Sequence, residues 1–172
     1  MIGRSTFGAA ASLALLLPTA AEAAPPARMT ISSFEQLARP LPLPYNEAAN
    51  ADADVVAAQT RARKGHKLLL IDLGGNWCLD CRILGGVMAT QPLAGWLSAR
   101  FEVVSVDVGR FDKNQQIQRS FGIQDRLEGV PALLVVNPRS GKLVNAGHVT
   151  ALADARSLTP QALADWFARW TR

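Results

Sequence analysis

The sequence predicts an α/β fold in which helices cover both faces of a mixed central sheet. Apolar and β-branched runs typical of buried strands, at residues 66–73, 101–108 and 132–136, alternate with segments of helical character. The last run is followed by a turn and a further strand-like segment at 142–148, which predicts a C-terminal antiparallel hairpin. We therefore expect a sheet with a parallel portion and an antiparallel edge.

The first expected helix spans residues 50–64. Asn50 or Asp52 can cap its start, and Gly65 provides its end. An apolar side formed by valines and alanines would face the sheet.

The second expected helix runs from Cys78 to about Ala89. It contains the pair Gly85-Gly86, and each glycine costs about 1 kcal/mol relative to alanine in a helix, so a bend is expected there. Each remaining helix has a proline or a capping residue at its start. The expected segments are 92–97, 114–121 and 160–170.

The composition indicates a soluble globular protein with one domain and short appendages. The chain has 172 residues, of which 49% are hydrophobic and 19% charged. Its formal net charge is +4, but the basic residues are scattered and do not alternate with aromatic residues along one face. A nucleic-acid partner is therefore not expected. Separately, we expect a monomer.

The N-terminus has the pattern of a secretory signal peptide. Arg4 precedes an apolar core at 7–17, and small residues at 18–23 form a cleavage site. This predicts a signal peptide at 1–23, a Pro-rich arm at 24–44 and one domain at 45–172. The expected location is an oxidising compartment, most simply a bacterial periplasm.

Cys78 and Cys81 are the only cysteines in the chain. They follow an expected strand and open an expected helix, so Cys78 should lie at an exposed helix N-terminus. There, unpaired N–H groups and the helix dipole favour a thiolate over a thiol. Cys81 would lie one turn further on, close enough to close a disulfide. The spacing predicts a dithiol redox site.

Two other interpretations of the cysteines are open. One is an incidental structural disulfide, although a bond across two residues constrains the unfolded chain very little. The other is a metal site, for which only His66 and His148 could join the cysteines among the residue types that usually accompany them. Redox chemistry is favoured over both, and no metal or cofactor is expected.

Asp72 lies inside the apolar run that precedes the cysteines. A carboxylate is rarely buried in such a run, because burying its charge without a partner is unfavourable. It could be a strand-end carboxylate that reaches solvent or caps a turn. Alternatively, it could be a buried acid or base that serves the nearby thiols. The residue pattern alone leaves both open.

From Leu68 to Arg172 the chain resembles the thioredoxin family, specifically a secreted bacterial thioredoxin-like protein. Trp77 directly precedes the Cys-x-x-Cys, Asp72 lies six residues before Cys78, and the Gly-Val-Pro of 129–131 precedes an apolar strand. All three features match the family in register. The resemblance implies a thioredoxin-like fold and thiol-disulfide oxidoreductase activity.

The resemblance also implies roles for individual residues. Cys78 would be the attacking thiolate, Cys81 the resolving thiol, and Asp72 the group that relays the proton lost by Cys81. These three form the expected catalytic set.

The expected substrate-binding residues are Trp77, Val130 and Pro131. Trp77 would form a wall of the site, although simple packing is an equal alternative. Pro131, in the cis form, would hold the chain against the sulfurs and present backbone groups of Val130 to an extended substrate.

Three departures from the family pattern concern the redox couple and the substrate. Leu79-Asp80 replaces the usual Gly-Pro between the cysteines, Gly74 stands where an aromatic residue is usual, and Gly86 stands where a proline bends the helix. We expect Asp80 to tune the couple: at an effective dielectric of 20–40 its charge opposes the Cys78 thiolate by roughly 1–2 kcal/mol. A less stabilised thiolate makes a less oxidising couple, so a reductase is expected.

The expected partners are disulfide-containing protein substrates and a membrane electron donor. Three alternatives remain open. They are a disulfide oxidase or isomerase that uses the same cysteines, a binding module that has kept only the fold, and a copper or zinc carrier that uses Cys78, Cys81 and His148.

Overall fold

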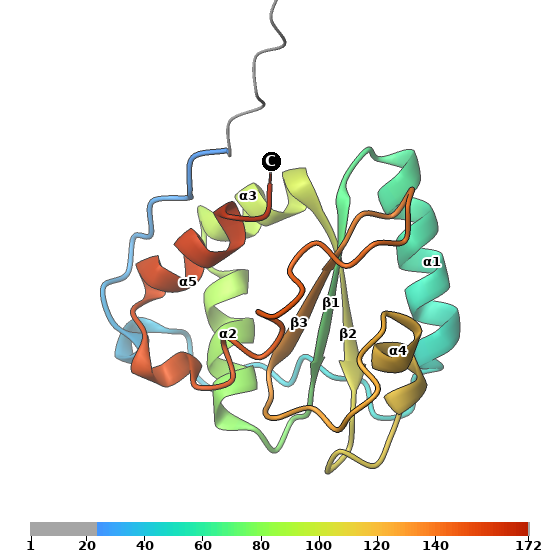
Figure 1. Ribbon diagram of the computed structural model, residues 1–172. Coiled ribbons are helices and arrows are strands. Elements are labelled where there is room, and N and C mark those ends of the chain that lie inside the picture. Colours follow the sequence, from blue (N-terminus) through green and yellow to red (C-terminus); the bar gives the residue numbers. More distant parts are fainter. Residues whose placement is uncertain (1–23, 172) are drawn as a thin grey trace, which may run out of the picture.

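The computed structural model describes residues 24–171, which contain a central sheet of three strands in the order β2-β1-β3 (Figure 1). The strands are β1 (Leu68–Gly74), β2 (Phe101–Asp107) and β3 (Ala132–Val136). The helices are α1 (Ala51–Lys64), α2 (Leu79–Ala89), α3 (Leu93–Arg100), α4 (Gln115–Ser120) and α5 (Pro160–Ala168), with short 3₁₀ turns at Phe34–Gln36 and Ala155–Ser157.

The strand pairing makes the sheet mixed. β1 runs parallel to β2, with Asp72 opposite Ser105, and antiparallel to β3, with Asp72 opposite Leu133. Helices α2, α3 and α5 lie on one face of the sheet, and α1 and α4 lie on the other (Figure 1). Each face carries its own cluster of buried apolar side chains. The predicted α/β architecture is confirmed.

The helix starts follow the capping signals in the sequence. The Asn50 side chain accepts a hydrogen bond from the backbone N–H of Ala53 (3.1 Å) at the start of α1. Thr159 does the same for Ala162 (3.1 Å) at the start of α5, where Pro160 is the first helical residue. These caps fix the direction in which each helix enters the fold.

The predicted second strand of a C-terminal hairpin, at 142–148, is wrong. This segment runs beside β3 but forms one isolated bridge with it, through Leu143. The reason is the fully buried Asn145. Its side-chain oxygen accepts a hydrogen bond from the N–H of Val135 (2.8 Å), and its side-chain N–H donates to the carbonyl of Leu133 (2.7 Å). A side chain thus occupies the place of a neighbouring backbone, and no regular ladder forms.

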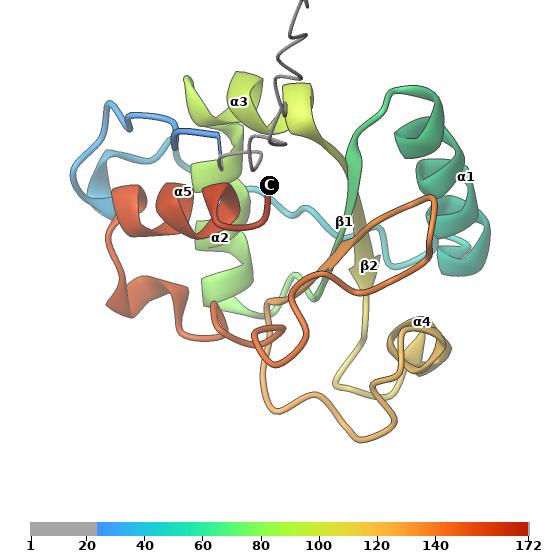
Figure 2. The same ribbon diagram turned by 45° about the horizontal axis from the view of Figure 1, so that its top comes forward.

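The N-terminal arm, residues 24–44, packs along α5 and α2 (Figure 2). Helix α2 is one continuous helix through Gly85 and Gly86. The bend that the sequence predicts there stays a prediction. A Cβ atom on Gly86 would lie 3.3 Å from the Leu37 side chain, and one on Gly85 would lie 3.3 Å from Pro44. The glycine pair therefore lets the arm approach the helix closely.

The predicted signal peptide, residues 1–23, lies outside the described residues. Within residues 24–171, no helix is both long and apolar enough to cross a membrane. The division into an arm and a domain stays a prediction; Leu37 and Leu41 of the arm belong to the same buried cluster as α2 and α5.

Candidate active site

The two cysteines form a disulfide at the start of α2. β1 ends at Gly74, and a turn follows in which the Cys78 N–H donates to the Gly75 carbonyl (3.0 Å). Cys78 is the N-cap of α2, and the two Cα atoms are 5.3 Å apart. The chain therefore has the strand–turn–helix arrangement that the sequence predicts around this pair.

Two backbone groups of opposite polarity face the Cys78 sulfur. The N–H of Cys81 points at Cys78 Sγ from 3.1 Å, and the carbonyl oxygen of Val130 lies 3.4 Å from it. The N–H stabilises negative charge on the sulfur, whereas the carbonyl oxygen disfavours a thiolate and can accept a hydrogen bond from a thiol. The Val130–Pro131 peptide bond is cis, as the resemblance implies for this loop.

Only one of the two cysteines keeps contact with solvent. Cys78 is 5% exposed and lines an open groove with a volume of about 640 Å³, whereas Cys81 is 0% exposed. Cys78 is less exposed than the sequence predicts, because the loop that carries Val130 lies against it. Cys78 is therefore accessible from the groove, and Cys81 is not.

Asp72 is buried, with 2% of its surface exposed, and lies on the face of β1 that α2 covers. Burial raises the pKa of its carboxyl group to about 7, and a hydrogen bond from the Tyr45 hydroxyl (2.9 Å to Asp72 Oδ1) opposes this rise. The interpretation as a strand-end carboxylate that reaches solvent is therefore wrong. A carboxyl group with a pKa of about 7 can both accept and return a proton near neutral pH.

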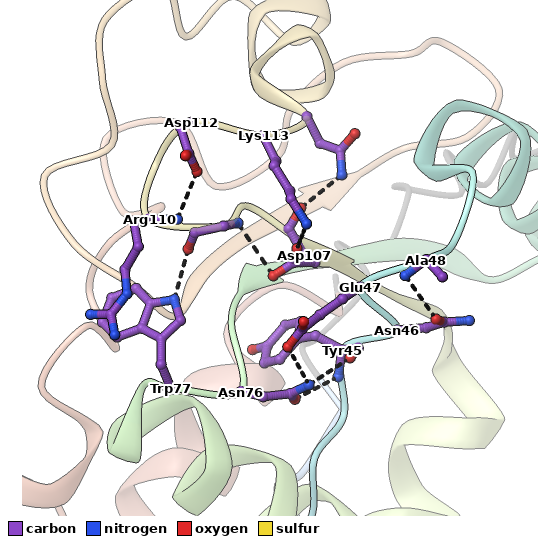
Figure 3. Close-up of polar contacts among 12 residues, drawn as sticks. Tyr45, Asn46, Glu47, Ala48, Asn76, Trp77, Asp107, Arg110, Asp112 and Lys113 are labelled. Atoms are coloured by element: carbon purple, nitrogen blue, oxygen red, sulfur yellow. Dashed lines mark hydrogen bonds and ion pairs between the residues drawn. The ribbon is translucent and has the colours of Figure 1, made fainter.

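Trp77 forms one rim of the groove and is 42% exposed. Its indole N–H donates to the Gly109 carbonyl (2.7 Å), and the Arg110 guanidinium lies 4.5 Å from its ring centroid (Figure 3). Phe111 lies next to it, with ring centroids 6.1 Å apart. The indole is therefore held at the surface and is not part of the core. Leu79, 45% exposed, gives the groove a second apolar edge.

Asp80 is 5% exposed and lies in an ion pair with Arg156. Arg156 Nη2 donates to Oδ2 (2.7 Å), and Arg156 Nε and the backbone N–H of Arg156 donate to Oδ1 (3.1 and 2.9 Å). Both residues line the groove beside Cys78. The sequence predicts the effect of Asp80 alone; Arg156 is distant along the chain, and no local pattern indicates it.

Tyr45 is the other residue of the site that sequence reasoning missed. It lies just after the Pro-rich arm, 27 positions from its partner Asp72. One signal was present: Gly74 stands where the family has an aromatic residue, and this leaves space for a ring from elsewhere in the chain.

His148, the third ligand in the metal-carrier alternative, packs against Trp170 with ring centroids 5.5 Å apart. Among residues 24–171, no group of three His, Cys, Asp or Glu side chains is arranged to hold a metal ion.

Comparisons with known proteins bear on the whole arrangement. A family model described as thioredoxin-like matches residues 49–138, which include the cysteine pair, Asp72 and Pro131. A disulphide isomerase from Xylella fastidiosa Temecula1 is similar, with 39% identity over 77% of this chain and 99% of that chain and a TM-score of 0.69. The C-terminal domain of Neisseria meningitidis DsbD in the oxidised form is 20% identical over 72% of this chain and 97% of that chain, with a TM-score of 0.45. A search of curated proteins finds no match.

Proposed function

Because this chain belongs to the thioredoxin-like family and is a thiol-disulfide oxidoreductase, we propose that it reduces protein disulfides in a bacterial periplasm. The location rests on the secretory pattern of residues 1–23. The direction of exchange rests on the two backbone groups that face Cys78 Sγ, the N–H of Cys81 and the carbonyl of Val130.

The backbone groups that face the Cys78 sulfur stabilise a negative charge on it only weakly. One N–H faces it at 3.1 Å, and the Val130 carbonyl oxygen at 3.4 Å works against the charge. A thiolate that is only weakly stabilised makes the reduced pair less favourable, so the couple is more reducing. This balance favours a reductase over an oxidase.

The reaction proceeds in two exchanges. The Cys78 thiolate attacks one sulfur of the substrate disulfide, which forms a mixed disulfide and releases the other substrate sulfur as a thiolate that takes up a proton. The Cys81 thiol then passes its proton to Asp72 and attacks Cys78 Sγ, which releases the second substrate sulfur as a thiolate that takes up a proton. Two electrons have moved to the substrate, and the Cys78–Cys81 disulfide remains.

The groove supplies the binding surface for this exchange. Trp77 and Leu79 offer apolar contacts on either side of Cys78, and the loop at Val130 and Pro131 lies across from the sulfur. An extended polypeptide could pair with backbone groups of Val130 while its disulfide meets Cys78. Disulfide-containing proteins are therefore the proposed substrates.

The oxidised pair must be reduced again before the next turnover. The donor must deliver two electrons and two protons, and a dithiol carried by a membrane protein meets this need in a compartment without a nucleotide-linked reductase. We propose such a membrane electron donor as the second partner.

One finding favours a second candidate, disulfide isomerisation. The structure that is 39% identical to this chain is described as a disulphide isomerase. Isomerisation also starts from the Cys78 thiolate, but the substrate resolves the mixed disulfide with one of its own thiols. The two functions therefore differ in their need for Cys81.

Redox state and substrate assays separate the candidates. Alkylation of thiols in intact cells should find the cysteine pair largely reduced; a largely oxidised pair would contradict the reductase and support an oxidase. In vitro, Cys81→Ala should abolish net reduction of a protein disulfide such as that of insulin. If Cys81→Ala instead keeps full activity in the refolding of a protein with scrambled disulfides, isomerisation is the function.

A further inference from the structure

The backbone of Tyr45 is hydrogen-bonded to the loop that precedes the cysteines. Its backbone N–H donates to Asn76 Oδ1 (3.1 Å), and its carbonyl accepts from Asn76 Nδ2 (2.8 Å), as Figure 3 shows. Asn76 lies two residues before Cys78. This paired amide contact holds Tyr45, the residue that directly follows the N-terminal arm, at the active site.

The side chain of Tyr45 reaches inward from this point. It is 2% exposed, and its hydroxyl donates to Asp72 Oδ1 (2.9 Å). A Cβ atom on Gly74 would lie 2.5 Å from Tyr45 Cζ and 2.9 Å from Cys81 Sγ. The phenol ring and the Cys81 sulfur therefore flank the same point above Gly74, and any side chain there would displace one of them.

We propose that Tyr45 is a positioning residue that orients the Asp72 carboxylate to accept the proton of Cys81 in the second exchange. The proposal deepens the proposed function and rests on its transfer of a proton from Cys81 to Asp72. Tyr45 contacts neither substrate nor the Cys78 sulfur in this scheme; it acts through Asp72.

The electrostatics of the buried cluster support this role. Burial and the neighbouring Asp72 raise the pKa of the Tyr45 hydroxyl, so it stays protonated and remains a donor at neutral pH. The titratable group in contact with Asp72 is Tyr45. The Cys81 sulfur flanks the same point above Gly74 as the Tyr45 ring. Lys67 and Glu102 line the cleft of about 410 Å³ that reaches Asp72 between α2, α3 and β2. Tyr45 is the one hydrogen-bond donor to the Asp72 side chain among the described residues.

The test uses Tyr45→Phe, which keeps the ring and removes the hydroxyl. The measured step is the Cys81-dependent release of glutathione from a mixed disulfide at Cys78, followed against pH. The rate of Cys78 attack on glutathione disulfide serves as the internal reference in each variant. In the wild type, release should rise with pH through about 7, the pKa of Asp72.

In Tyr45→Phe the inflection should move up by about one pH unit, and release at pH 7 should slow by about fivefold, because the charged carboxylate loses a hydrogen bond. In Asp72→Asn the inflection should disappear, and adding Tyr45→Phe to it should change nothing further.

The outcomes separate the two claims. If Asp72→Asn removes the inflection but Tyr45→Phe leaves it in place, Tyr45 only packs and this inference is overturned while the proposed proton transfer stands. If Asp72→Asn also keeps the wild-type profile, the proton transfer and the role of Tyr45 both fail. Thermal denaturation of Tyr45→Phe checks that the variant is folded.

Discussion

The carboxylate of Asp80 is held by three N–H groups of Arg156, 76 residues further along the chain. The residue between the cysteines that should destabilise the Cys78 thiolate is therefore paired with a cation in the same groove. The Arg156 side chain is 56% exposed and the Asp80 side chain only 7%, so the carboxylate is the buried partner of the pair. Tuning of the cysteine couple by Asp80 stays a prediction, and Arg156 becomes part of it.

The first prediction concerns this pair. Asp80→Asn should lower the pKa of Cys78 by about half to one unit, because the thiolate loses a nearby negative charge and gains the unpaired Arg156 cation. Arg156→Gln should raise it by a similar amount. Absorbance of the thiolate as a function of pH measures both, and the double variant should return near the wild type. Unchanged titrations in both single variants would refute electrostatic tuning.

The second prediction concerns stability and pH. The pKa of Asp72 rises from 3.8 to about 7 on folding, so the folded chain keeps a proton that the unfolded chain releases between these values. The stabilising contribution of that proton is complete below about pH 4 and is lost as the pH rises through 7, which amounts to on the order of 4 kcal/mol.

Asp72→Asn removes this proton linkage. The free energy of unfolding of the oxidised variant, measured by urea denaturation, should rise relative to that of the wild type from about pH 4 to pH 7, and the difference should level off above that range. Parallel curves for the two proteins over that range would contradict the buried, pKa-shifted carboxyl group.

The third prediction concerns the groove. Trp77→Ala should raise KM for a disulfide-containing protein by about three- to tenfold, because an exposed aromatic contact is worth about 1 kcal/mol. The rate with a small disulfide reagent, too short to reach the rim, should change little. Trp96→Ala is the matched control, since Trp96 lies away from the groove and donates to the Pro25 carbonyl. Equal KM values for the two variants would mean that Trp77 only packs.

The fourth prediction concerns Asn145, whose side chain replaces a strand. Asn145→Ala leaves the N–H of Val135 and the carbonyl of Leu133 buried without these partners. The free energy of unfolding should fall by on the order of 3 kcal/mol, as measured by chemical denaturation. Val144→Ala, at the exposed neighbouring position, should cost far less. A loss below about 1 kcal/mol for Asn145→Ala would show that water replaces the side chain.

Local sequence patterns predicted the parts of the molecule that depend on neighbours in the chain. The β1 run, the Asn50 and Thr159 caps and the Cys78–Cys81 turn each follow from a few adjacent residues. The mixed sheet follows from the order of strands and helices.

The features that the sequence did not reveal are contacts between distant segments. Tyr45, just after the arm, contacts Asp72, and Arg156, in the segment before α5, contacts Asp80. Neither contact leaves a periodic signal in the sequence. The predicted strand at 142–148 failed for a related reason, because Asn145 satisfies the backbone of β3 with its side chain. Alternation of residue types cannot reveal such a substitution.

The central claim is that the sulfur at the start of α2 attacks and its neighbour resolves. The most direct measurement is to mix each single-cysteine variant with a disulfide-containing protein and to identify the covalent complexes by mass spectrometry. Cys81→Ala should accumulate a reducible complex joined through Cys78, and Cys78→Ala should give none. A complex joined through Cys81, or equal trapping by both variants, would contradict the account.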